Sequence, residues 1–201
     1  ISNTAIADLK GLTDSGNALT ITVNSASVNA ADINVLNAKT TVALNVASGT
    51  ITGALSDIKA AYDANVAGTI TGLGNEVITI TDTGSINAAD LNDLNVLTTG
   101  VVTATGVTEI KGKAVDLIKT YSPSNAAGVV AGLGNENVVL TDLASVSAAD
   151  ITTIDAATTG TLTASTATFD AMSYLASNAD LIKAFGTQTT SAITHYIAHG
   201  I

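Results

Sequence analysis

The two histidines of the chain are the side chains best suited to chemistry, and they stand four residues apart. His195 and His199 lie on one face if their segment is helical, which is the spacing that a pair of zinc ligands requires. The glutamate that follows the first histidine in the H-E-x-x-H pattern is absent, and Tyr196 occupies its position. We therefore interpret the pair first as packing groups that satisfy local hydrogen bonds, with a metal site as the alternative.

A second set of polar side chains follows the strands of an internal repeat. Asn24, Asp82 and Asp142 each come directly after an alternating apolar stretch. Side chains at such positions predict caps on turn amides, and the acidic ones, Asp82 and Asp142, are weak candidates for a calcium site shared with backbone carbonyls. We expect no cofactor, with calcium as the alternative. We expect it to affect stability only weakly, because the acids are isolated rather than clustered.

No pattern typical of an enzyme is present. The Gly-Leu-Gly-Asn runs at 72–75 and 132–135 have the composition of a phosphate-cradling loop, but they fall between strands and no Lys-Ser or Lys-Thr follows them. The chain has no cysteine and no Gly-x-Ser-x-Gly run for a nucleophile. A polysaccharide-cleaving enzyme would need carboxylates clustered with Lys or Arg. We therefore expect that the protein is not an enzyme.

The charge balance excludes two classes of partner. The chain of 201 residues carries 17 acidic and 7 basic residues, a net charge of −10, and every basic residue is a lysine. Such a surface repels phosphate backbones, so nucleic-acid binding is not expected. No stretch approaches 18 consecutive apolar residues, so membrane insertion is not expected either.

The elements that position these residues are repeated along the chain. Gly-Leu-Gly-Asn-Glu at 72–76 returns at 132–136, and the Asn-Ala-Ala-Asp run at 87–90 returns as Ser-Ala-Ala-Asp at 147–150, with an earlier copy at 29–32. A fixed period of tens of residues is typical of an array of stacked supersecondary units. With 46% hydrophobic but only 3% aromatic residues, small aliphatic side chains must fill the interior.

Each unit of the repeat has the pattern strand, strand, short helix. Residues 77–81, 101–105 and 108–111 alternate like half-buried strands, and 114–121 has the pattern of a helix. Asp32, Asp90 and Asp150 are expected at equivalent sites near helix starts, and Asn87 and Ser147 are expected to cap their helices. The Thr-Thr-Gly runs at 98–100 and 158–160 are expected to end helices, with glycine in the left-handed conformation.

These patterns predict an α/β solenoid with parallel sheets, about 30 residues per coil and 60 per double coil, with a right-handed wind. A solenoid requires residues 77–82 to run parallel to their copy at 137–142. Strands that are antiparallel, or that lie in separate sheets, would contradict it. A globular α/β fold with an internal duplication is the alternative.

Two segments resemble known families. Ile110-Lys111-Gly112, the Ala-Ala-Asp-Leu helix start and the Thr-Thr-Gly-Val-Val-Thr-Ala-Thr run at 98–105 resemble Ala/Thr/Val/Gly-rich repeats of large exported cyanobacterial surface proteins and of cyanophage structural proteins. Residues 174–200 resemble a short helical module common in bacterial exoproteins, often beside calcium-binding repeats, although no Gly-Gly-x-Gly-x-Asp nonapeptide occurs here. The resemblances imply an extracellular or cell-surface location, with a virion as the alternative.

The organisation that we expect is a repeat solenoid over 1–168 and a C-terminal helical cap module over 169–201, where both Phe and the only Met gather. The expected function is a non-enzymatic structural or adhesive scaffold segment of an exported surface, filament or virion protein. The alternative is a calcium- or carbohydrate-dependent extracellular binding module. Because the chain begins at Ile1 without a visible cap or a signal peptide, we expect a piece of a longer protein, whose partners are adjoining repeats or further copies of itself.

Overall fold

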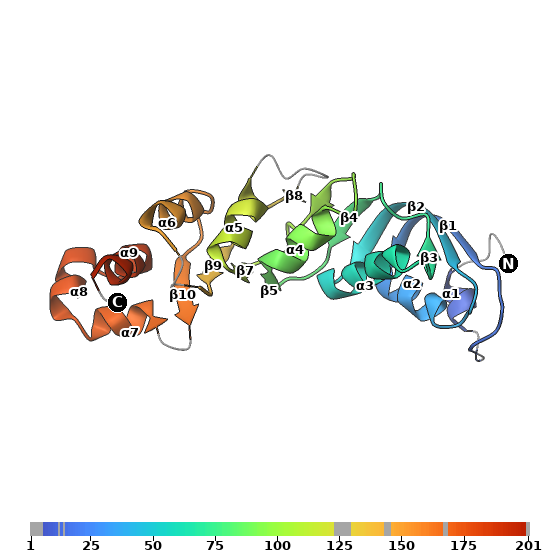
Figure 1. The fold of residues 1–201 in the computed structure, drawn as a ribbon, viewed down its shortest axis with the longest axis horizontal. Coiled ribbons are helices and arrows are strands. Elements are labelled where there is room, and N and C mark those ends of the chain that lie inside the picture. Colours follow the sequence, from blue (N-terminus) through green and yellow to red (C-terminus); the bar gives the residue numbers. More distant parts are fainter. Residues whose placement is uncertain are drawn as a thin grey trace. The chain divides into compact units, whose positions relative to one another are not determined.

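The computed structural model describes residues 6–11, 13, 15–122, 130–142, 146–166 and 169–199, and shows an α/β protein with parallel sheets (Figure 1). The chain forms two compact units. Unit 1 comprises Ile1–Asp82, Asp93–Gly106 and Ser124–Gly132, and unit 2 comprises Thr83–Asn92, Val107–Pro123 and Leu133–Ile201. Each unit therefore draws on three separate stretches of the chain, unlike two domains that follow one another. The expected boundary near residue 168 stays a prediction, since 167 and 168 lie outside the described residues.

The sheet of unit 1 is parallel throughout. Its strands, in spatial order, are β1 (Thr22–Asn29), β2 (Leu44–Gly53), β4 (Val77–Ile80), β6 (Val102–Thr103) and β8 (Val130–Ala131), and β3 (Ile70–Thr71) pairs with the start of β2. Val46 and Ile51 of β2 are fully buried, while the residues between them face outward or are half-buried. The alternation of period two holds over Leu44–Ala47 and again over Thr50–Gly53, but the buried positions change from even to odd numbers between these two stretches.

The sheet of unit 2 is built in the same way. β5 (Ser85–Asn87), β7 (Glu109–Gly112), β9 (Asn137–Leu140) and β10 (Leu162–Thr166) are parallel neighbours, and β11 (Phe169–Asp170) closes the edge antiparallel to β10.

One pairing scheme occurs in both units. In each sheet a row of buried aliphatic residues faces its neighbours in register: Val28, Ile51, Ile78 and Val102 in unit 1, and Ile86, Ile110, Val138 and Leu162 in unit 2. The copies of a repeated segment therefore pair with copies of the same neighbouring strands in the two sheets.

The expectation that 77–82 and 137–142 share a sheet is wrong, so this pair of strands does not meet the criterion that was set for the solenoid. β4 lies between β2 and β6, whereas β9 lies between β7 and β10 of the other sheet. The reason is a mismatch of two periods. Ile78 pairs with Val102 and Val102 with Val130, so two steps across the sheet advance 52 positions (130 minus 78), while the sequence repeats after 60 (132 minus 72). The surplus of eight residues carries the copy of β4 into the second sheet.

The helices begin where the sequence predicts. The repeat contributes α2 (Ala30–Asn37), α3 (Leu55–Val66), α4 (Ala88–Asn95), α5 (Ala114–Tyr121) and α6 (Ala148–Asp155), and the ends add α1 (Ile6–Lys10), α7 (Ala171–Ala176), α8 (Ala179–Phe185) and α9 (Thr189–His199). In Figure 1, α2 and α3 lie side by side against β2. No helix in the described part of the chain is both long and apolar enough to cross a bilayer.

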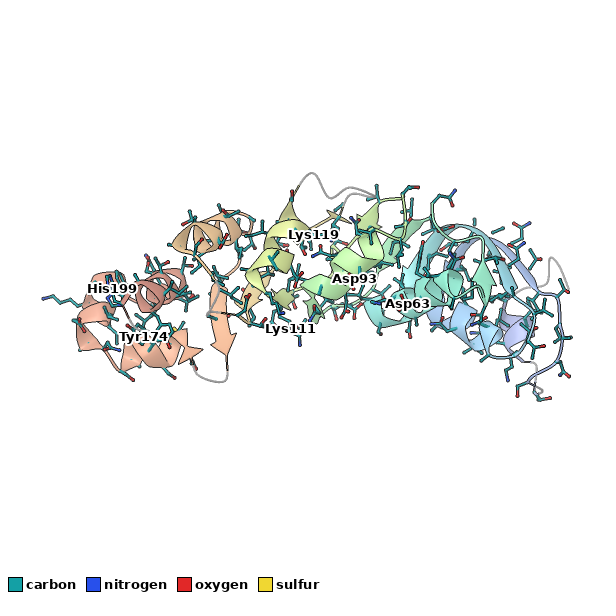
Figure 2. The ribbon with its side chains drawn as sticks, viewed as in Figure 1. Asp63, Asp93, Lys111, Lys119, Tyr174 and His199 are labelled. Carbon is teal, nitrogen blue, oxygen red and sulfur yellow. The ribbon has the colours of Figure 1, made fainter. Side chains whose placement is uncertain are left out.

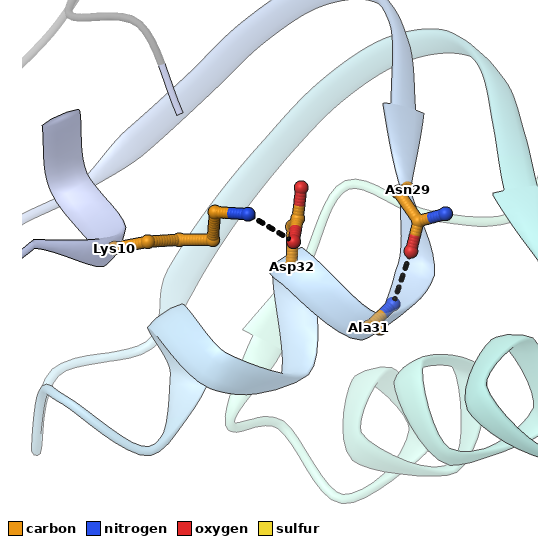
Figure 3. A network of polar contacts seen from close by, with 4 residues as sticks. All are labelled: Lys10, Asn29, Ala31 and Asp32. Atoms are coloured by element: carbon orange, nitrogen blue, oxygen red, sulfur yellow. Dashed lines mark hydrogen bonds and ion pairs between the residues drawn. The ribbon is translucent and has the colours of Figure 1, made fainter. Parts of the chain in front are cut away.

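The predicted first turns are confirmed for Asp32, Asp90 and Asp150. Asn29 Oδ1 accepts a bond of 2.9 Å from the Ala31 amide at the start of α2, next to an ion pair of 2.6 Å between Lys10 and Asp32 (Figure 3). Ser147 and Asp150 form a reciprocal capping box on α6. The bonds from Ser147 lower the pKa of the exposed Asp150 carboxyl below its usual value.

The predicted role of the Thr-Thr-Gly runs is wrong. α4 ends at Asn95 and α6 at Asp155, before those runs, and neither Gly100 nor Gly160 has a positive φ. Glycine is needed there for a different reason. A Cβ on Gly100 would lie 2.1 Å from the Glu76 carbonyl oxygen, and a Cβ on Gly160 would lie 2.2 Å from that of Glu136.

Candidate functional site

Two buried carboxylates, one in each unit, are the most unusual groups in the described part of the chain. Glu76 and Glu136 are each 1% exposed. Both close the Gly-Leu-Gly-Asn-Glu run that recurs in the sequence. A buried carboxylate is unfavourable unless donors surround it, so the bonds that each one accepts decide what it does.

In unit 1, Glu76 is bound by its own turn and by a helix. Its Oε2 accepts bonds from the Gly74 amide (2.7 Å), the Asn75 amide (3.1 Å) and the Tyr62 hydroxyl of α3 (2.7 Å). Burial, and secondly the bond to Glu76, raise the pKa of Tyr62 far above its usual value. The tyrosine therefore stays a neutral donor to the carboxylate.

Unit 2 repeats this arrangement. Glu136 Oε2 accepts bonds from the Gly134 amide (2.8 Å) and the Asn135 amide (3.1 Å), and the Tyr121 hydroxyl at the end of α5 donates to Oε1. Burial and the bond to Glu136 raise the pKa of Tyr121 in the same direction.

The Thr-Thr-Gly runs contact these turns. Thr98 Oγ1 donates to the Glu76 carbonyl oxygen at 2.9 Å and accepts from the Gly100 amide at 3.0 Å. Thr158 does the same with Glu136 and Gly160, at 2.7 and 3.0 Å. Two motifs that look independent in the sequence thus form one cluster, which we call the Tyr–Glu turn: Tyr62, 74–76 and 98–100 in unit 1, and Tyr121, 134–136 and 158–160 in unit 2.

The Tyr–Glu turn explains the glycine-rich runs without a phosphate. The two amides that a phosphate cradle would aim at an external anion donate instead to the carboxylate of the same turn. This role of Glu76 and Glu136 was not predicted from the sequence. The signal was available, because a tyrosine and a glutamate both recur, 14 or 15 positions apart, in each copy.

Asp82 and Asp142 cap helices. Asp82 Oδ2 accepts from the Leu55 amide at 2.7 Å, and Asp142 Oδ1 accepts from the Ala114 amide at 2.8 Å. The helices concerned, α3 and α5, begin after Ala54 and Lys113, whose side chains make no cap bond. Capping is thus confirmed for both acids, although the amides belong to helix starts rather than turns.

The calcium hypothesis for Asp82 and Asp142 stays a prediction. Asn24, the third member of the set, is an exposed residue of β1 that faces Ala47 of β2. Within the described residues, no group of three or more His, Cys, Asp or Glu side chains is placed to hold a metal ion.

The two histidines come together on α9, as the spacing predicts. Their ring centres are 4.9 Å apart. His195 Nδ1 lies 3.0 Å from the hydroxyl of Tyr174 on α7, and the Phe185 ring lies 5.9 Å from the His195 ring. Figure 2 labels Tyr174 and His199 on their two helices. The predicted local hydrogen bond is present for His195.

Comparison with known proteins adds no assignment: no family model, no curated protein and no solved structure matches this chain. The resemblances described from the sequence therefore stay expectations.

Proposed function

We propose that the chain is a non-enzymatic structural or adhesive scaffold segment of an exported surface, filament or virion protein. The observation that carries the proposal is the duplicated Tyr–Glu turn. Its tyrosines and glycine-rich amides, groups that elsewhere bind ligands or do chemistry, donate to the buried carboxylates in both units, although Glu76 Oε1 has no hydrogen-bond partner among the described residues. The same buried polar groups occur in both units and serve to hold the turns together. Such duplication favours a repeat scaffold over an enzyme.

The architecture that fits this role is an α/β solenoid whose sequence repeats every 60 residues, although two steps across a sheet advance only 52 positions, or about 26 per coil instead of the 30 predicted. Its support is the regular advance of the parallel strands. Val102 follows Ile78 by 24 positions and Val130 follows Val102 by 28 in unit 1, and the same two steps join Ile86, Ile110 and Val138 in unit 2. β4 and β9 lie in separate sheets, so the solenoid we propose is not one in which every copy of a strand stacks in the same sheet.

We also propose that 1–168 form the repeat and 169–201 a helical cap. The support is a set of contacts at the end of unit 2. Thr190 Oγ1 donates to Asp155 of α6 at 2.6 Å, and Thr189 Oγ1 donates to the Leu162 carbonyl oxygen of β10. β11 adds the antiparallel strand that ends this sheet.

The location we propose is extracellular or cell-surface, with a virion as the alternative. Its support is the resemblance of the repeats and of the C-terminal module to exported proteins. The acidic surface and the absence of cysteine are compatible with it. The partners we propose are adjoining repeats of a longer chain or further copies of this one, and neither nucleic acid nor a membrane core.

The test separates a scaffold from a ligand-dependent binding module. The melting temperature is measured in millimolar calcium and in chelator, and the labelled protein is applied to a glycan array in both. A scaffold predicts a shift below about 5 °C and no calcium-dependent glycan signal. A larger shift that Asp82→Asn or Asp142→Asn abolishes, or a saturable glycan signal, would replace the scaffold by the binding module.

A further inference from the structure

We propose that His195 and His199 form a binding site for a divalent transition metal, with Cu²⁺ the preferred ion. This inference goes beyond the scaffold function and depends on a different part of the molecule. The two rings project from successive turns at the C-terminal end of α9. His195 is half-buried and His199 is exposed, so the pair is anchored yet accessible.

The distance between the rings fits a shared metal ion. A metal bound to one nitrogen of each ring lies about 2.0–2.1 Å from that nitrogen, hence about 3.2 Å from each ring centre. Bond angles of about 90–109°, the range from square-planar to tetrahedral, then place the ring centres about 4.5–5.2 Å apart. The observed separation is 4.9 Å. The separation of the two rings is therefore compatible with one shared ion.

Tyr174 orients one of the ligands. When His195 Nδ1–H donates to the Tyr174 oxygen, 3.0 Å away, the lone pair of the ring is on Nε2. Metal-binding histidines usually have this kind of outer hydrogen bond, which fixes the tautomer and the ring orientation. Tyr174 is a positioning residue here. It is itself supported by an edge-on contact with the Tyr196 ring at 5.4 Å.

The surroundings favour a cation and leave room for further ligands. His199 ends α9, where the helix dipole is negative, and the chain as a whole carries a net charge of −10. Both histidines line a pocket of about 340 Å³ together with Phe185 and the hydroxyl residues Thr190, Ser191 and Thr194. Water or an incoming donor completes the coordination there.

The ligand type determines which ion binds. Two neutral imidazoles favour Cu²⁺ over Ni²⁺ and Zn²⁺ in the usual order of stability, whereas Ca²⁺ and Mg²⁺ prefer oxygen ligands. Since no third His, Cys, Asp or Glu joins the pair among the described residues, we expect moderate affinity and exchangeable positions on the ion.

The experiment is a titration of the full chain with Cu²⁺, Ni²⁺, Zn²⁺ and Ca²⁺ by calorimetry, with electron paramagnetic resonance of the Cu²⁺ complex. The expected result is one Cu²⁺ per chain, coupled to two imidazole nitrogens, with weaker Ni²⁺ and Zn²⁺ binding and no competition from Ca²⁺. His199→Ala, at an exposed position, and His195→Ala should each weaken Cu²⁺ binding about tenfold or more. Tyr174→Phe should lower the Cu²⁺ affinity but leave the coupling to two imidazole nitrogens in the spectrum. A merely structural role of Tyr174 would not change the affinity while it leaves the spectrum the same.

The matched control keeps the number of histidines but separates them. His199→Ala is combined with Val115→His, because Val115 is 68% exposed on α5. The proposal predicts that this variant binds Cu²⁺ no better than His199→Ala alone. Equal Cu²⁺ affinity in the original chain and in this control, or a spectrum without two imidazole nitrogens in the original chain, would overturn the proposal.

Discussion

At the scale of single residues, the Tyr–Glu turn shows how a buried charge is tolerated. Glu76 accepts two amide bonds and one tyrosine bond, and bonds to a charged acceptor contribute more than neutral ones. Tyr62 is 1% exposed and ranks among the largest fully buried side chains of the described chain. Its ring therefore fills the interior, and the hydrogen bond from its hydroxyl offsets part of the free energy lost when the Glu76 carboxylate is removed from water.

Removing the hydroxyl of Tyr62 tests this account. Tyr62→Phe keeps the ring and deletes the bond to Glu76, and should lower the free energy of unfolding by about 2 kcal/mol. Denaturant titration followed by circular dichroism measures the loss. Val66→Ala, at a 71% exposed position of the same helix, is the matched control and should change stability by less than about 0.5 kcal/mol. Equal effects of the two substitutions would contradict the role given to Tyr62.

Alkaline pH provides a second test at this scale. The folded-state pKa of Tyr62 and of Tyr121 is raised, so each contributes stability that is fully present below the unfolded-state pKa of about 10 and is lost as pH rises from there. We expect the free energy of unfolding to fall above pH 10. The Tyr62→Phe, Tyr121→Phe double variant should be less stable at neutral pH but show a shallower fall. Parallel curves for the two proteins would show that these tyrosines do not carry the dependence.

At the scale of elements, close backbone approach holds the repeat together. Within each Tyr–Glu turn, the glycine of the Thr-Thr-Gly run lies against the backbone of the glutamate. Side-chain bonds link neighbouring helices: Asn34 Nδ2 donates to the Asp57 carbonyl oxygen and Asn92 Nδ2 to that of Asp116, both at 2.9 Å. The third copy has Thr152 at the equivalent position, and its hydroxyl bonds back to Ala148. The asparagine link is thus replaced at the copy beside which α9 packs, where the bond from Thr190 of α9 to Asp155 of α6 joins the two helices.

A methyl group at Gly100 tests the close approach. Gly100→Ala places a Cβ 2.1 Å from the Glu76 carbonyl oxygen, which is backbone and cannot swing aside, so we expect a loss of about 3 kcal/mol or more. Gly84→Ala is the matched control, since its φ is not positive and no atom lies within 4 Å of the added Cβ. Thermal and denaturant unfolding of both variants gives the comparison. A Gly100→Ala protein as stable as Gly84→Ala would show that the turn adjusts freely.

Local patterns in the sequence predicted the elements but not their partners. The alternation at Val77–Ile80, the helix at Ala114–Tyr121 and the first-turn acids are set by neighbours within a few residues, and all are confirmed. The sheet that contains β9 depends on the difference between a 52-residue advance and a 60-residue period, which no local pattern records. The Tyr–Glu turn was also missed, because the glycine-rich runs were considered as turns between strands or as phosphate loops, and the glutamate that follows each run was not given a role.

At the scale of the whole molecule, we propose that the chain is an array of repeated units that serves as a scaffold. An array that ends needs a cap, because unpaired strand edges promote association. Deletion of residues 169–201 removes β11 and α9 with its bond to Asp155, and should turn a soluble protein into an aggregating one. Light scattering and analytical ultracentrifugation measure this. A truncated chain that stays monomeric with an unchanged melting temperature would contradict the capping role.

The central claim is that the repeat is an extensible array, and lengthening the chain by one period tests it most directly. A second copy of residues 73–132 is inserted after Gly132, so that both new junctions, Gly132 to Leu73 and Gly132 to Leu133, preserve the native Gly-Leu sequence. Small-angle X-ray scattering of the monomeric product measures its maximum dimension. The account predicts a folded protein longer by about 10–14 Å, the spacing of the two or three strands that each sheet gains, with undiminished stability. A product that aggregates, or that folds without lengthening, would contradict it.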